Sequence, residues 1–204
     1  MKLPHRILWS AVLLLPASAL LAELSADEYA VLNAVLNHGL GENCAEIIIE
    51  EETSSGSLAL NTEKYSYARV AELVAVDMAL LKSWDRHNGA FDYLGESFNL
   101  NCDYQLITKA ARNKLFANAE DDAELGWRNF RRKYPNAAGI IRLAKPFISV
   151  EASKPGGAPS VSALAYVEFD CGPGCGSGRF VVLNKGRDSS WETIGGGLVW
   201  MATE

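Results

Sequence analysis

The sequence predicts one α+β domain, in which N-terminal helices pack on a C-terminal antiparallel β-meander. Apolar residues recur at helical spacing in several segments before residue 135, and from residue 139 onward they alternate with polar residues. The chain has 204 residues and is 49% hydrophobic, which suffices for one sizeable core. No internal repeat or interdomain linker divides residues 23–204. We therefore expect one domain whose helices cover one face of the sheet.

The first 22 residues have the features of a secretory signal peptide. Lys2 and Arg6 give a positive start, residues 7–15 are almost purely apolar, and cleavage is expected after Ala19 or Ala22. The apolar stretch is shorter than the roughly 20 residues of a membrane span, although an uncleaved anchor is the alternative. We expect a soluble bacterial protein, periplasmic or secreted, whose mature chain has no stable membrane insertion.

The charge of the chain argues against two classes of partner. The formal net charge is −6, and the first 22 residues hold two of the 19 basic residues and none of the 25 acidic ones, so the remainder carries −8. Nucleic acids and anionic membranes bind clustered cations. We therefore expect neither as a partner, and leave an unknown protein or a small ligand.

The predicted helices lie before the sheet. Ser25 and Glu28 form a capping box for the first helix, which ends near Gly39. A β-branched run of isoleucines predicts an early strand over residues 45–52. An apolar stripe predicts a helix at 67–84, and an acidic start with a basic end that matches the helix dipole predicts another at 121–133. A short helix is also expected at 109–118.

The meander follows from period-two alternation and from the turn residues between its segments. A loop composition at 153–160 and a triple glycine at 195–197, which indicates a bulge or a close approach, interrupt the pattern. Four or five strands are expected, at 139–144, 145–152, 161–169, 179–185 and 191–201.

Four cysteines, Cys44, Cys102, Cys171 and Cys175, argue for disulfides in an exported chain. Cys171 and Cys175 flank a Gly-Pro-Gly turn, so a short bridge between them is geometrically natural, and Cys44 is then left to pair with Cys102. The sequence does not decide the pairing outright. A redox pair is the competing interpretation of Cys171 and Cys175, although redox motifs place two residues between the cysteines and open a helix.

Three polar residues in one strand form the candidate binding site. Tyr166, Glu168 and Asp170 alternate along the chain, so they would point together into a cleft on one sheet face. A catalytic alternative is His87 with Asp85 at a helix end, where a histidine normally meets the helix dipole or solvent. We assign no catalytic residue.

Cofactor and metal motifs are incomplete. Residues 172–178 are glycine-rich, but a strand follows them instead of the helix that a phosphate loop requires. The histidines after the signal peptide lie at no ligand spacing from a cysteine, so no metal is expected. The acidic run at 50–52 lacks the alternation of a calcium loop and is interpreted as a solvated strand end. We expect no cofactor.

Several segments of the chain carry a family resemblance, namely Trp127, Phe130, 133–135, 139–143, 163–167, 171–178, Trp191 and 199–201. Together they resemble a family of uncharacterised exported bacterial proteins. In that family a helix leads to a Tyr-Pro pair, an isoleucine-rich strand and a hairpin with a Cys-Gly-x-x-Cys-Gly tip. The resemblance implies the extent of the domain and a disulfide in the hairpin, and it carries no activity. The chain departs from the family in the segment at 153–160 and in its triple glycine.

The sequence favours a non-catalytic exported domain that binds a protein or a small ligand. The alternative is an envelope enzyme, a hydrolase or thiol–disulfide catalyst that uses His87 and Asp85 or Cys171 and Cys175. Element order alone also suggests a cystatin-like or NTF2-like cone with a ligand pocket under a curved sheet. Ligand binding predicts a largely apolar pocket of several hundred Å³ against the sheet.

Overall fold

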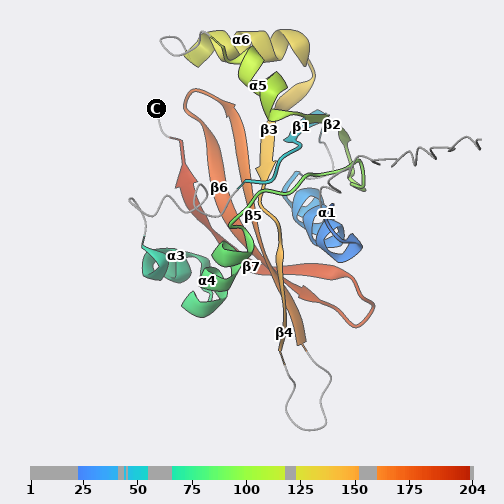
Figure 1. Ribbon diagram of the computed structural model, residues 1–204, viewed down its shortest axis with the longest axis vertical. Coiled ribbons are helices and arrows are strands. Elements are labelled where there is room, and N and C mark those ends of the chain that lie inside the picture. Colours follow the sequence, from blue (N-terminus) through green and yellow to red (C-terminus); the bar gives the residue numbers. More distant parts are fainter. Residues whose placement is uncertain are drawn as a thin grey trace, which may run out of the picture.

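The computed structural model describes residues 23–40, 44, 46–54, 66–117, 123–151 and 160–202. The predicted signal peptide and most of the predicted loop at 153–160 lie outside these residues. The described chain has an α+β fold, as the sequence predicts. Figure 1 shows a twisted central sheet with helices on both of its sides.

Within the described residues, seven strands form one sheet in the order β2-β1-β3-β5-β6-β7, with β4 paired to β5 beside β3. The C-terminal strands are antiparallel, whereas β1 pairs in parallel with both β2 and β3. The predicted antiparallel strands are therefore joined by two parallel strands. Unlike consecutive strands of a simple meander, β3 and β4 both pair with β5 and not with each other. The strands are β1 (Glu46–Glu50), β2 (Asp103–Ile107), β3 (Ala137–Leu143), β4 (Phe147–Glu151), β5 (Ser160–Gly172), β6 (Cys175–Lys185) and β7 (Trp191–Met201).

The helices cover both faces of the sheet, so the expectation of one covered face is wrong. Residues 163, 165 and 167 of β5 pack against α1, and residues 164 and 166 pack against α3 and α4 on the opposite face. Residues 47–49 of β1 are all fully buried, and a strand buried on both sides needs two covering layers. The described helices are α1 (Ala26–Leu40), α3 (Tyr67–Val74), α4 (Met78–His87), α5 (Lys109–Leu115) and α6 (Ala123–Lys133).

The single helix predicted at 67–84 is two helices. Ala75 ends α3 in the left-handed conformation at φ 56°, and the side chain of Asp77 caps α4 by accepting from the Ala79 N–H. Both helices pack on one cluster under β5, β6 and β7, with Trp84 and Tyr166 at its centre. The apolar stripe therefore continues across the break.

Two helix pairs share the face opposite α1. The α5–α6 pair lies at the end of the sheet near β1 and β3, and the α3–α4 pair lies farther along it (Figure 1). In the described part of the chain, no helix is both long and apolar enough to cross a bilayer.

The four cysteines lie in two pairs, Cys44 with Cys102 and Cys171 with Cys175. Their Cα atoms are 5.4 Å and 5.2 Å apart, inside the range of about 4.4–6.8 Å that a disulfide requires. These are the two pairs that the sequence favours. The first ties the approach to β1 to the approach to β2, and the second closes the β5–β6 hairpin.

Candidate functional site

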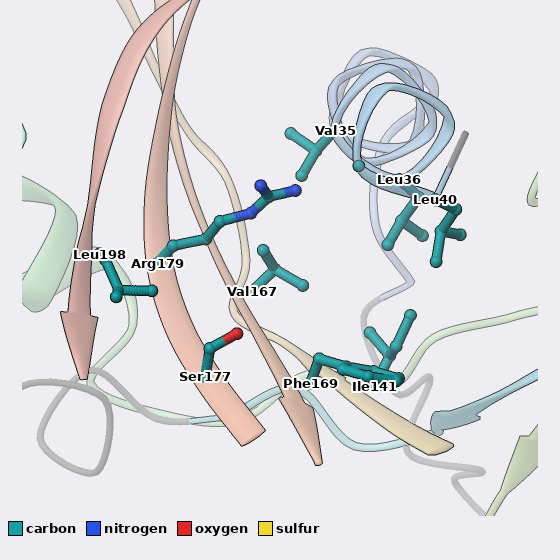
Figure 2. Close-up of a pocket in the computed structure, with 10 residues that line it drawn as sticks. Val35, Leu36, Leu40, Ile141, Val167, Phe169, Ser177, Arg179 and Leu198 are labelled. Carbon is teal, nitrogen blue, oxygen red and sulfur yellow. The ribbon is translucent and has the colours of Figure 1, made fainter. Parts of the chain in front are cut away.

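A mostly apolar pocket of about 330 Å³ lies between α1 and the sheet (Figure 2). Its apolar wall comes from one side of α1 and from the facing residues of β3, β5 and β7. Two polar side chains, Ser177 and Arg179, enter it from β6. The full lining is Val35, Leu36, Gly39, Leu40, Ile141, Val167, Phe169, Ser177, Arg179 and Leu198.

The strand alternation explains this lining. Val167 and Phe169 are two apart in β5 and lie on the α1 face, while Glu168 between them lies on the other face. In β6, Ser177 and Arg179 line the pocket, and the next two residues on the same strand face, Val181 and Leu183, belong to the core under α1. The pocket therefore occupies the end of the sheet where this core stops short of filling the space below the helix.

Arg179 is the charged group of the pocket. Its guanidinium reaches from β6 towards α1 (Figure 2) and lies so close to Gly39 that a Cβ atom at that position would collide with it. The C-terminal end of a helix attracts a cation, which accounts for the direction of the side chain. Among the described residues, however, no carboxylate forms an ion pair with Arg179, and no group forms a hydrogen bond with it. In the part of the chain that the structure describes, this half-buried cation in an apolar pocket thus has no anion beside it.

The opposite sheet face carries a row of alternating charges that runs across three strands. Arg142 of β3 is directly opposite Glu168 of β5, with Arg142 Nη2 2.9 Å from Glu168 Oε2. Glu50 follows Ile49, the register partner of Ile141, and so lies beside Arg142. Arg112 of α5 approaches this row from above, with its Nε 3.0 Å from Glu50 Oε1. The row forms part of the wall of a cleft of about 540 Å³.

The structure brings Tyr166 and Glu168 together, as the sequence predicts for two residues on one strand face. The Tyr166 hydroxyl donates to Glu168 Oε1 at 2.9 Å and accepts from the indole N–H of Trp200, also at 2.9 Å. Burial, and then the negative charge of Glu168, raise the pKa of Tyr166 far above its ordinary value, so this hydroxyl stays protonated. Glu168 lines the cleft, and the hydrogen bond from the buried Tyr166 hydroxyl holds the Glu168 carboxylate in place.

Asp170 follows Glu168 on the same face of β5, but its surroundings differ from those of Glu168. Burial raises the pKa of its carboxyl, and the positive charge of Arg142 and a backbone hydrogen bond from Gly172 partly oppose this. Asp170 is not part of the described lining of the cleft. The three predicted residues therefore share a face but not one cavity.

The acidic run at 50–52 is not the solvated strand end that the sequence suggests. Glu50 is only 8% exposed, because it points to the face that α5 covers. Burial raises the pKa of its carboxyl, and the charges of Arg112 and Arg142 pull that pKa down in part. Glu52 also lines the cleft, with its Oε2 3.8 Å from the ammonium of Lys109.

The candidate catalytic pair does not form in the structure. Asp85 accepts a 2.5 Å hydrogen bond from the Tyr67 hydroxyl, whereas His87 Nε2 lies 3.7 Å from a Glu28 carboxylate oxygen. The two side chains are two residues apart on a helix and so point in different directions. Among the described residues, no group of three or more His, Cys, Asp or Glu side chains is arranged to hold a metal ion.

Sequence reasoning did not single out Arg142 or Arg179. Each falls in a strand with ordinary alternation, where a single basic residue is most simply read as facing solvent. The two-residue spacing within a strand could have indicated the position of Arg179. Val181 and Leu183 face the core, and Arg179 lies on the same strand face as these two residues.

Comparisons of the chain with protein families, with curated proteins and with solved structures give no match. The resemblance to a family of exported proteins therefore stays a prediction.

Proposed function

We propose that this protein is an exported, non-catalytic domain that binds a small amphipathic anion in the pocket between α1 and the sheet. The ligand would carry a carboxylate or a similar acidic head on a short apolar chain. The single observation that carries the proposal is Arg179, a half-buried cation without an acidic partner among the described residues, inside an otherwise apolar pocket.

The chemistry of the lining supports both halves of such a ligand. A carboxylate can accept two parallel hydrogen bonds from a guanidinium, and hydrogen bonds between charged groups are about twice as strong as neutral ones. Leu36, Leu40 and Phe169 offer an apolar surface, against which each buried methylene contributes about 0.8 kcal/mol. A cavity of about 330 Å³ suits a chain of medium length and excludes large lipids.

Titration calorimetry with octanoate and octanol tests the proposal, because the two ligands share a chain and differ in charge. The protein should bind octanoate about tenfold more tightly than octanol, which corresponds to about 1.4 kcal/mol. Arg179→Met should remove that preference and leave octanol binding unchanged. Arg187→Met, which changes an exposed arginine in the turn between β6 and β7, is the matched control.

Two results would overturn the assignment. One is equal affinity of the natural protein for octanoate and octanol, and the other is an Arg179→Met variant that keeps the preference for the acid. The variant should fold, since methionine replaces a cation that has no ion pair within the described ranges with an apolar side chain of similar length.

The proposal also states that this protein is exported and loses an N-terminal signal peptide. Its support is the signal-like start of the sequence together with two cysteine pairs at disulfide distance, which suit an oxidising compartment. Intact mass measurement of the protein from a periplasmic or culture fraction should show loss of the first 19 or 22 residues and of four thiol hydrogens. A full-length mass, or four free thiols, would refute export.

A further inference from the structure

We infer that the charged cleft on the face opposite α1 is a second binding site, and that it takes a neutral polyhydroxylated ligand, a saccharide unit. This inference does not depend on the pocket beside Arg179, because the two cavities lie on opposite faces of the sheet. The cleft is the larger of the two, at about 540 Å³, and Lys109 and Arg112 of α5 form one side of it.

Two buried oxygen atoms in this cleft accept no hydrogen bond from any residue that the structure describes. Glu50 Oε1 has Arg112 Nε 3.0 Å away, but the N–H does not point along that line, so within the described residues the oxygen accepts no hydrogen bond. Ser54 Oγ, also in the lining, is buried and has no hydrogen-bond partner there either. A buried polar atom without a partner costs about 1–3 kcal/mol, so a ligand that offers hydroxyl groups at both positions would be favoured.

The charges of the cleft favour a neutral ligand over an ion. Three acidic and three basic side chains line it, and each basic group already has an acidic partner, as in the pairs of Arg142 with Glu168 and Lys109 with Glu52. An anion or a cation would therefore meet as much repulsion as attraction. A hydroxyl group both donates and accepts, so it can add to alternating carboxylates and guanidinium groups without breaking a pair.

Phe91 adds an apolar element to this polar lining. Its ring is 53% exposed at the cleft and is held by an edge-to-face contact with Tyr93 at 5.7 Å between centroids. The face of an aromatic ring is electron-rich and attracts the weakly positive C–H groups that one side of a sugar ring presents. Buried acceptors beside an exposed aromatic ring thus match the two kinds of surface of a saccharide.

Saturation-transfer NMR and calorimetry with glucose, N-acetylglucosamine and maltose test this inference. Glycine, acetate and methylammonium serve as the zwitterionic, anionic and cationic probes. We expect at least one saccharide to bind in the millimolar range and more tightly than any of the three ions. Glu50→Gln replaces the charged acceptor of the hydrogen bond from a saccharide hydroxyl with a neutral one, so it should weaken saccharide binding about three- to tenfold. Phe91→Ala should weaken the same binding at least about threefold.

Matched controls separate the site from general effects. Glu192→Gln and Ile194→Ala change an exposed acid and an exposed apolar side chain on β7 and should leave saccharide binding unchanged. Arg179→Met should also leave it unchanged, so failure here is distinct from failure of the octanoate experiment. The inference is overturned if no saccharide binds, if an ion binds more tightly, or if Glu50→Gln and Phe91→Ala bind like the natural protein.

Discussion

Replacing Arg142 with methionine should destabilise the fold, because it leaves Glu168 without its cation. The Glu168 side chain is 10% exposed, and the Arg142 side chain is 29% exposed. Removing one partner of a fully buried pair costs about 3–5 kcal/mol, and an exposed pair contributes about 1 kcal/mol or less. Water reaches Arg142 in part, so we expect a loss of about 2–3 kcal/mol in the free energy of unfolding.

The double variant Arg142→Met with Glu168→Gln isolates the cause. Glutamine keeps an oxygen that accepts from the Tyr166 hydroxyl, as Glu168 does at 2.9 Å, but it carries no charge. The double variant should therefore recover about half of the lost free energy. A stranded carboxylate predicts this recovery, whereas simple loss of packing around the arginine stem does not.

Urea unfolding of the oxidised protein, followed by tryptophan fluorescence, measures both variants against the natural chain. For a domain of this size, about 2–3 kcal/mol corresponds to a fall of about 4–12 °C in melting temperature. A loss below about 1 kcal/mol in the single variant, or a double variant no more stable than the single one, would refute the argument.

Three further outcomes can be checked. Burial raises the pKa of Glu50 above its ordinary value of 4.5, so the folded state keeps this proton to higher pH than the unfolded chain, and stability from this group falls as pH rises above about 4.5. Glu50→Gln should flatten that part of the pH dependence of the unfolding free energy between pH 4 and 7; an unchanged slope would count against it. Replacing both Cys44 and Cys102 with alanine should cost about 4 kcal/mol by the chain-entropy estimate for a separation of 58 residues, measured by urea unfolding. A loss under about 1 kcal/mol would show that strain cancels the benefit. Gly178→Ala should cost about 2 kcal/mol, since a Cβ there collides with the hydrogen-bonded tyrosine and tryptophan side chains on that face, while Gly195→Ala, which meets nothing within 4 Å, is the control. Equal melting temperatures for these two variants would contradict the collision.

The sequence predicts the antiparallel part of the fold because alternation within a strand and turn residues between neighbouring strands are patterns of adjacent residues. The alternation at 191–201 identifies β7 with both of its ends, and the Gly-Pro-Gly turn identifies the β5–β6 hairpin. The sequence does not identify β2, because its first four residues alternate exposed and half-buried side chains at a sheet edge and only its last residue, Ile107, is buried. Its place depends on parallel pairing with β1, which begins 57 residues earlier in the sequence.

The candidate site shows the same limit. Tyr166 and Glu168 are recognisable because two-residue spacing on a strand fixes their common face. Their partner Arg142 comes from another strand, and the register between strands cannot be read from either one alone. The burial of Glu50 likewise depends on a helix that arrives later in the chain, which is why composition alone suggests a solvated carboxylate there.

The link between Cys44 and Cys102 has a consequence for the exposed border of the sheet. It lies just ahead of Glu46 and Asp103, the first paired residues of β1 and β2. β2 is the outermost strand of the sheet, so its free side presents backbone N–H and C=O groups with which a strand from another molecule can pair. Because the disulfide joins the start of β2 to the start of β1, β2 cannot separate from β1 there or exchange between copies while the sulfurs stay oxidised. Reducing conditions would thus open a route to domain swapping and aggregation.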